Sequence, residues 1–72
     1  MKGDDKMEIK DKLRKVREQK GVSQRQAAAE MGISHNYYNE LETGKYDNPT
    51  LFFMQAIAEY YNCSLDELFS RE

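Results

Sequence analysis

Apolar residues recur at helical spacing in five separate stretches of the chain. In the first stretch, MEIKDKLRKVREQKG, Ile9, Leu13 and Val16 lie three or four positions apart, and lysine and arginine fill many of the other positions. This period places the apolar side chains on one face of a helix. Gly21 follows where a C-terminal cap is expected. The pattern predicts an amphipathic helix with a basic outer surface.

A second, shorter helix is predicted over the stretch VSQRQAAAEMG. Ser23 is a candidate N-cap, and Gln26 stands three residues later, which is the spacing of a capping box. The apolar face of this helix consists of Ala27, Ala28 and Met31. Gly32 is expected to end the helix.

A third helix follows after a short turn. Ile33 is an apolar anchor before Ser34, a second candidate N-cap, and the helix is expected to run from about His35 to Glu42, ending at Gly44. Its inward residues are Tyr38 and Leu41. Helices this short are marginal in water, so each must be held by packing on the rest of the chain.

Two more helices are predicted after the turn-forming stretch KYDNP. Thr50 can cap a helix over LFFMQAIAEYYN, and Asn62 can end it in a left-handed conformation. The inward stripe is expected to consist of Leu51, Met54, Ile57, Ala58 and Tyr61. In SLDELF, Ser64 and Glu67 form a capping box beside the apolar residues Leu65, Leu68 and Phe69. No strand pattern is found, so the predicted class is all-α.

Length and composition set further bounds on the class of protein. The 72 residues fit one small domain without room for a deep substrate cavity. We expect a flexible tail at residues 1–6 and the folded domain over residues 7–72. No apolar run approaches the roughly 20 residues that cross a bilayer, and the first ten residues are too charged for a secretory signal, so a cytoplasmic protein is expected.

The chemistry of catalysis is poorly represented in the sequence. The single cysteine and single histidine cannot supply the four ligands of a structural zinc site. No glycine-rich phosphate loop precedes a helix, and His35 and Cys63 lie in separate elements without an acid or base pattern around them. We therefore expect no enzyme, no metal, no cofactor and no small-molecule ligand.

The second and third predicted helices together fit a helix-turn-helix. Two helices that cross steeply through a short turn need a small residue at their close approach, a glycine with positive φ and apolar facing sides. Ala28 and Gly32 occupy the first two places. The facing apolar residues are Ala27, Met31, Ile33, Tyr38 and Leu41.

Residues 13–69 resemble the Xre/Cro/phage-repressor, or lambda-repressor-like, family of helix-turn-helix DNA-binding domains. The resemblance rests on LRKVREQKGVSQ, AAAEMGIS, YNELETGK, the NP before the fourth helix and CSLDELF. It implies a compact five-helix domain that binds double-stranded operator DNA, usually as a dimer. The third helix of such a domain enters the major groove of a roughly palindromic operator. We expect a transcriptional regulator, and more specifically a repressor.

The resemblance also assigns roles to individual residues. Gln24 matches a family residue that binds a phosphate and braces the recognition helix. Base contacts and nearby phosphate contacts fall on the first two turns of the third helix, at Ser34, His35, Asn36, Tyr37, Asn39 and Glu40. Phosphate contacts after that helix fall at Lys45, Tyr46 and Asn48, and Arg25 adds positive charge within the helix-turn-helix.

The chemistry of these side chains is suited to reading base edges. Asn36 can pair with an adenine edge, and His35 can donate to guanine or to a phosphate. Glu40 can accept from a cytosine amino group or exclude wrong sequences. The N-terminus of the helix that begins at Gln24 offers N–H groups to an anion. Each of these residues has an alternative interpretation as a surface residue without any contact.

Five residues are interpreted through packing. Tyr37 and Tyr38 point about 100° apart on a helix, so we expect Tyr38 in the core and Tyr37 exposed for a contact with DNA. Arg17 and Glu42 match a partly buried ion pair of the family and are predicted to be structural. Cys63 matches an apolar family position and is interpreted as a small buried residue.

Charge and aromatic content depart from the family pattern. The formal net charge is −2, although non-specific DNA affinity comes from lysine and arginine facing phosphates. Phe52 and Phe53 cannot both face inward beside Leu51 and Met54, and the family usually has polar residues there. At least one ring is therefore expected to be exposed at an interface. We predict a homodimer formed around the fourth and fifth helices.

These departures leave a second functional hypothesis open. The chain could be a protein-interaction module of the helix-turn-helix type, antitoxin-like or a co-regulator, with weak or secondary DNA binding. A DNA reader should lose base discrimination on Asn36→Ala, whereas an interaction module should be indifferent there and sensitive at Phe52.

Overall fold

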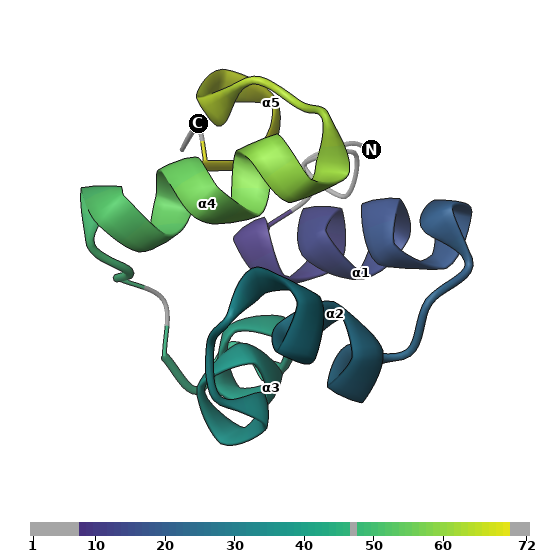
Figure 1. Ribbon diagram of the computed structural model, residues 1–72. Helices are drawn as coiled ribbons and strands as arrows, with labels where there is room; N and C mark the ends of the chain where they lie inside the picture. The colour runs from purple at the N-terminus through teal and green to yellow at the C-terminus, as the bar shows by residue number, and fades with distance from the viewer. Residues whose placement is uncertain (1–7, 47, 70–72) are drawn as a thin grey trace, which may run out of the picture.

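The computed structural model describes residues 8–46 and 48–69 (Figure 1). This part of the chain forms five helices, and the all-α prediction is confirmed. The helices are α1 (Ile9–Lys20), α2 (Gln24–Met31), α3 (His35–Thr43), α4 (Leu51–Tyr61) and α5 (Leu65–Phe69). The tail expected at residues 1–6 lies outside the described residues.

Side-chain caps begin most of the helices where the sequence predicted them. The hydroxyls of Ser23, Ser34 and Thr50 accept hydrogen bonds from the backbone N–H three residues later, at 3.0, 2.9 and 3.4 Å. Ser64 and Glu67 form the complete capping box before α5. The box expected at Ser23 is wrong in its second half, because the Gln26 amide donates to the Glu30 carboxylate at 3.1 Å instead. A further capping box, which was not predicted, joins Glu8 and Asp11 at the start of α1.

The core lies where the helices meet. Its buried apolar residues are Leu13, Ala27, Ala28, Tyr38, Leu41, Ile57, Ala58, Tyr61 and Leu68. α1 packs against α3, α4 and α5, and α2 packs against α3 and α4. Every helix therefore contributes to one shared core, which is what holds α2 and α3 in spite of their short length.

The stripe predicted for α4 is wrong at its first residue. Ile57, Ala58 and Tyr61 are buried and Met54 is half-buried, but Leu51 is 56% exposed. Figure 1 shows the first turn of α4 at the edge of the molecule, away from α1 and α5. Helical periodicity placed Leu51 on the inward stripe, but the core does not extend to that end of the helix.

No helix in residues 8–46 and 48–69 has the length and apolar character needed to cross a bilayer.

Candidate nucleic-acid interface

An ion pair between Arg17 of α1 and Glu42 of α3 fixes the position of α3 on the core side. The Arg17 guanidinium donates from Nε to Glu42 Oε2 at 2.7 Å and from Nη2 to Glu42 Oε1 at 3.2 Å. Its Nη1 also donates to the Val22 carbonyl at 2.9 Å. Glu42 is 1% exposed, so the pair is largely removed from water. The predicted ion pair is present, and its two-point geometry fixes the direction of both side chains.

The hydrogen bonds of Gln24 extend this network to the start of α2. Its amide nitrogen donates to Glu42 Oε1 at 3.0 Å, and its amide oxygen accepts from Asn39 Nδ2 at 2.8 Å. One side chain of α2 therefore contacts two successive turns of α3. This is the bracing geometry expected of Gln24, and it also engages the Asn39 amide inside the protein.

The protonation state of Glu42 follows from its surroundings. Burial alone would raise the pKa of this carboxyl group, but hydrogen bonds from Arg17, Tyr38 and Gln24, together with the charge of Arg17, hold its pKa below the ordinary value. The hydroxyls of Tyr38 and Tyr61 are hydrogen-bonded to each other in the core. Burial is the largest cause that raises the pKa of Tyr38, followed by its hydrogen bond with Glu42. At neutral pH the network contains an ionised Glu42, a protonated Arg17 and a neutral Tyr38.

The residues predicted to contact DNA divide into two groups by exposure. The exposed group consists of Arg25, Ser34, Asn36, Lys45, Tyr46 and Asn48. The half-buried group consists of Gln24, His35, Tyr37, Asn39 and Glu40. The first turn of α3 thus presents Asn36 outward, while the same helix is held by the polar network below it.

Tyr37 is half-buried, so the expectation that its side chain is exposed is wrong. Its ring centroid lies 5.4 Å from that of Tyr46 and 4.9 Å from that of Phe53. The Tyr37 hydroxyl is buried and has no hydrogen-bond partner within residues 8–46 and 48–69. Tyr38 and Tyr37 do point in different directions from α3, as expected. Tyr37 is nevertheless covered, because Tyr46 of the connection and Phe53 of α4 pack against its ring.

These rings belong to an aromatic cluster that was not predicted from the sequence. Its members are Tyr37, Tyr46, Phe52 and Phe53, and the ring centroids of Phe52 and Phe53 lie 5.6 Å apart. Phe52 is 74% exposed and Phe53 is half-buried, so the prediction of at least one exposed ring is confirmed. A signal was present in the sequence, because Tyr37 and Phe53 both stand third in helices joined by one connection.

Comparison with known proteins identifies the arrangement. The family model described as helix-turn-helix matches residues 13–68, which is most of the chain. The chain belongs to the Xre/Cro-type helix-turn-helix family.

Relatives of this helix-turn-helix domain are named as transcriptional regulators. The HTH-type transcriptional regulator SlrR of Bacillus subtilis is 35% identical over 60 residues, covering 83% of this chain and 40% of its own length. PuuR of Escherichia coli, also an HTH-type transcriptional regulator, is 36% identical over 59 residues, covering 82% of this chain and 31% of its own length. The HTH-type transcriptional activator BcrR of Enterococcus faecalis is 30% identical over 66 residues, covering 92% of this chain and 32% of its own length. The chain thus spans two fifths or less of the length of these relatives.

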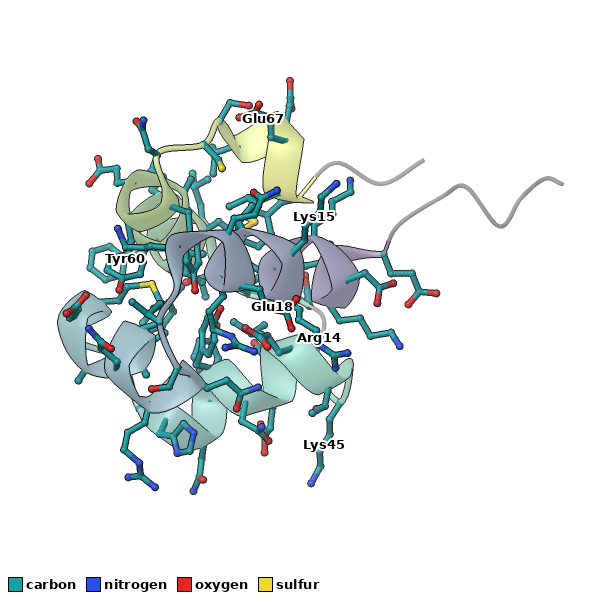
Figure 2. The ribbon with its side chains drawn as sticks, turned by 90° about the vertical axis from the view of Figure 1, so that its right-hand side faces the viewer. Arg14, Lys15, Glu18, Lys45, Tyr60 and Glu67 are labelled. Carbon is teal, nitrogen blue, oxygen red and sulfur yellow. The ribbon has the colours of Figure 1, made fainter. Side chains whose placement is uncertain are left out.

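The basic residues of α1 point to two different sides of this helix. Figure 2 shows Arg14 pointing from α1 toward the end of α3, with Lys45 beyond it, whereas Lys15 points the other way, toward α5 and Glu67. Only part of the positive charge of α1 therefore lies on the side of the helix-turn-helix. This distribution favours a domain of modest non-specific DNA affinity.

Cys63 packs against the core but is not fully buried, so its interpretation as a buried residue is only partly correct. It is half-buried, and its thiol donates to the Tyr61 carbonyl with an Sγ–O distance of 3.4 Å. Burial is the main cause that raises the pKa of the Cys63 thiol, and the charge of Glu67 adds to it. A raised pKa disfavours the reactive thiolate. Among the residues that the structure describes, no cluster of histidine, cysteine and carboxylate side chains could hold a metal ion.

Proposed function

We propose that this domain binds operator DNA in the cytoplasm as a sequence-specific transcriptional regulator, with α3 in the major groove. The observation that carries the proposal is the contrast between the two sides of α3. On one side, Glu42 is hydrogen-bonded to Arg17 and Asn39 is hydrogen-bonded to Gln24. On the other side, Asn36 in the first turn is exposed. A rigidly held helix with free polar side chains at its N-terminal end is the arrangement with which helix-turn-helix proteins read base edges.

The proposed contacts follow the chemistry of each side chain. Asn36 pairs with an adenine edge, and His35 donates to guanine or to a phosphate beside it. Glu40 accepts from a cytosine amino group or excludes wrong sequences. Arg25 and Lys45 supply positive charge toward the backbone, and the N-terminus of α2 offers its N–H groups to a phosphate. The remaining proposed contacts with the sugar-phosphate backbone come from Gln24, Ser34, Tyr46 and Asn48.

The proposed DNA complex contains two copies of the domain on a roughly palindromic operator. Phe52 and Leu51 expose apolar surface next to each other at the start of α4. Association through this surface, involving Phe53 and extending toward α5, joins two half-site readers of modest affinity. Such coupling raises the effective concentration of the second reader without any new contact to DNA.

Repression is the sign of regulation that we propose for this activity. A compact domain that occupies promoter DNA excludes polymerase from the same site by volume alone. A reporter gene placed behind the selected operator tests the sign directly, and increased reporter expression in the presence of the protein would overturn repression while leaving DNA recognition intact.

The test of DNA recognition begins with selection of genomic fragments by the purified protein. The best fragment and a scrambled duplex are then titrated by fluorescence anisotropy at two salt concentrations. We expect a specificity ratio above about a thousandfold and a steep loss of affinity at the higher salt. Equal affinity for the two duplexes would contradict the proposal.

Two asparagine variants separate base reading from backbone contact. We expect Asn36→Ala to lose about 1 to 3 kcal/mol of discrimination at one or two base pairs of the selected site. Asn48→Ala is the matched control, since loss of a phosphate contact weakens binding to all duplexes alike. A uniform loss for both variants would show that Asn36 does not read a base.

The exposure of Phe52 favours a second candidate function, a protein-interaction module with weak or secondary DNA binding. An exposed aromatic ring on a chain of net charge −2 fits a protein partner better than a phosphate backbone. In that case, partner capture would depend on Phe52 and would be indifferent to Asn36→Ala. Because Phe52 also belongs to the proposed pairing surface of the DNA-binding function, Asn36→Ala is the variant that separates the two functions.

A further inference from the structure

Tyr37 joins three segments of the chain through its ring. It stands in the first turn of α3, and its ring contacts Tyr46 in the connection after α3 and Phe53 in the first turn of α4, with centroid distances of 5.4 and 4.9 Å. Both pairs are tilted, at 54° and 45°, within the geometry in which aromatic rings attract one another. Tyr37 is thus the common member of the two contacts.

The hydroxyl of Tyr37 contributes nothing visible to these contacts. It is buried and has no hydrogen-bond partner among the described residues. Burial is the largest cause that raises the pKa of Tyr37, and nearby Tyr46 adds to it, so the group stays neutral. A buried neutral hydroxyl is not placed to meet a phosphate on the surface. What Tyr37 supplies is the ring.

The residue held by this ring belongs to the proposed phosphate-contacting segment. The Tyr46 amide donates to the Glu40 carbonyl at 3.1 Å, and its side chain is 37% exposed. Lys45 is the adjacent residue and is exposed. Fixing the ring of Tyr46 against Tyr37 therefore fixes the backbone from which Lys45 extends.

We propose that Tyr37 is a positioning residue for DNA binding, which holds Lys45 and Tyr46 in register with α3 through its ring contacts with Tyr46 and Phe53. This inference rests on the proposed function. Its physical content is preorganisation, because a segment that is already ordered loses less conformational entropy when its side chains meet phosphates. Tyr37 thus acts through its neighbours and not by touching DNA itself.

The DNA-binding test compares Tyr37→Phe with Tyr37→Ala on the selected and scrambled duplexes over a range of salt concentrations. We expect Tyr37→Phe to keep the parent affinity and salt slope, because it keeps the ring. We expect Tyr37→Ala to weaken binding to both duplexes by about tenfold and to lower the salt slope by about one phosphate contact. Equal losses in the two variants would show a direct contact by the hydroxyl and would overturn the proposal.

A second measurement in the free protein does not depend on DNA. Amide hydrogen exchange reports on the Tyr46 amide, and the Ile33 amide, which donates to the Ala28 carbonyl at 3.0 Å, serves as the internal control. We expect Tyr37→Ala to speed exchange at Tyr46 but not at Ile33, and Tyr37→Phe to change neither. Unchanged exchange at Tyr46 in Tyr37→Ala would overturn the proposal.

The two measurements also distinguish failure of this inference from failure of the proposed function. If the parent protein does not separate selected from scrambled duplexes, the proposed function fails, and hydrogen exchange alone decides whether Tyr37 holds the segment. If Tyr37→Ala is unfolded, Phe53→Leu takes its place, since it removes the other aromatic partner and keeps apolar volume. We expect faster exchange at Tyr46 in that variant as well, and unchanged exchange there would overturn the proposal.

Discussion

Glu42 illustrates how one buried charge can set the position of a helix. Its two carboxylate oxygens accept from Arg17 of α1 and Gln24 of α2, while its backbone belongs to α3. A buried carboxylate is tolerated only when its lone pairs are satisfied in this way. Any shift of α3 along α1 or α2 would break these bonds, so the network admits a narrow range of helix placements.

Loss of the Arg17 guanidinium should therefore strongly destabilise the folded domain. We expect Arg17→Met to lower the free energy of unfolding by about 3 to 5 kcal/mol, because Glu42 would remain buried without its positive partner. Urea denaturation followed by circular dichroism measures the change. Arg14→Met, on an exposed position of the same helix, is the control and should stay within about 0.5 kcal/mol of the parent. Similar losses in both variants would argue that the buried pair contributes little.

The same carboxyl group predicts a pH dependence. Because hydrogen bonds and the Arg17 charge outweigh burial and hold the pKa of Glu42 below its ordinary value of 4.5, the folded protein binds this proton more weakly than the unfolded chain. The stabilisation by ionised Glu42 is fully present above that ordinary value. It is lost as the pH falls through the lower pKa of the folded protein.

Glu42→Gln provides the comparison for this effect. We expect the parent to exceed the variant in unfolding free energy by a constant amount near neutral pH and by less as the pH falls below about 4.5. Urea denaturation over a pH series measures both curves. A difference that stays constant down to the most acidic folded conditions would contradict the assignment to Glu42.

At the scale of elements, the turn between α2 and α3 depends on backbone conformation more than on space. Gly32 has φ +77, and a Cβ built there would meet no atom within 4 Å. Gly32 therefore supplies the positive φ expected of it, while Ala28, the small residue expected at the close approach of the helices, is 1% exposed. Asn62 ends α4 in the same left-handed region, with φ 57, without being a glycine.

Two substitutions at Gly32 should differ accordingly. We expect Gly32→Ala to cost about 1 to 2 kcal/mol, because an L-residue with a Cβ is strained in the left-handed region. Gly32→Asn should cost less, since asparagine tolerates this conformation. Thermal unfolding of the two variants measures the difference. An equal or larger cost for asparagine would show that space limits this turn after all.

The elements were largely predictable because their signals are local. Ser23, Ser34 and Thr50 cap helices through bonds to residues three positions away, and the residues that end them are adjacent to the last turn. Leu51 and Tyr37 were misjudged because their exposure depends on where other helices end and which rings come to meet them. Tyr60 was missed for the same reason, since its hydroxyl binds Glu30 of α2 and Lys20 lies over its ring.

For the molecule as a whole, the proposed pairing of two copies depends on Phe52. We expect Phe52→Ser to leave the unfolding free energy within about 0.5 kcal/mol of the parent, because its side chain is 74% exposed. It should reduce dimer formation in sedimentation and the affinity for a two-half-site operator, while binding to one half-site is unchanged. Glu59→Ser, also exposed on α4, is the control. Unchanged dimerisation in Phe52→Ser would place the pairing surface elsewhere.

The candidate site was predictable from the sequence only in part. The ion pair of Arg17 and Glu42 was predicted through a family resemblance over residues 13–69, and the structure shows its geometry directly. The aromatic cluster around Tyr37 was not predicted, because its contacts join residues from two helices and their connection. Helical periodicity describes each helix separately, so the matching positions of Tyr37 and Phe53 showed that a contact was possible but not that the rings meet.

The exposure of Asn36 has a consequence for how such a protein can change over generations. The side chains that fix α3 are Arg17, Gln24 and Glu42, and they lie beneath the helix, whereas Asn36 points outward. Replacement of an outward residue costs little folding free energy. Under the proposed function, substitutions at Asn36 can therefore change the target sequence without first passing through an unfolded variant, so duplicated copies of this fold diverge in target while their architecture is inherited unchanged.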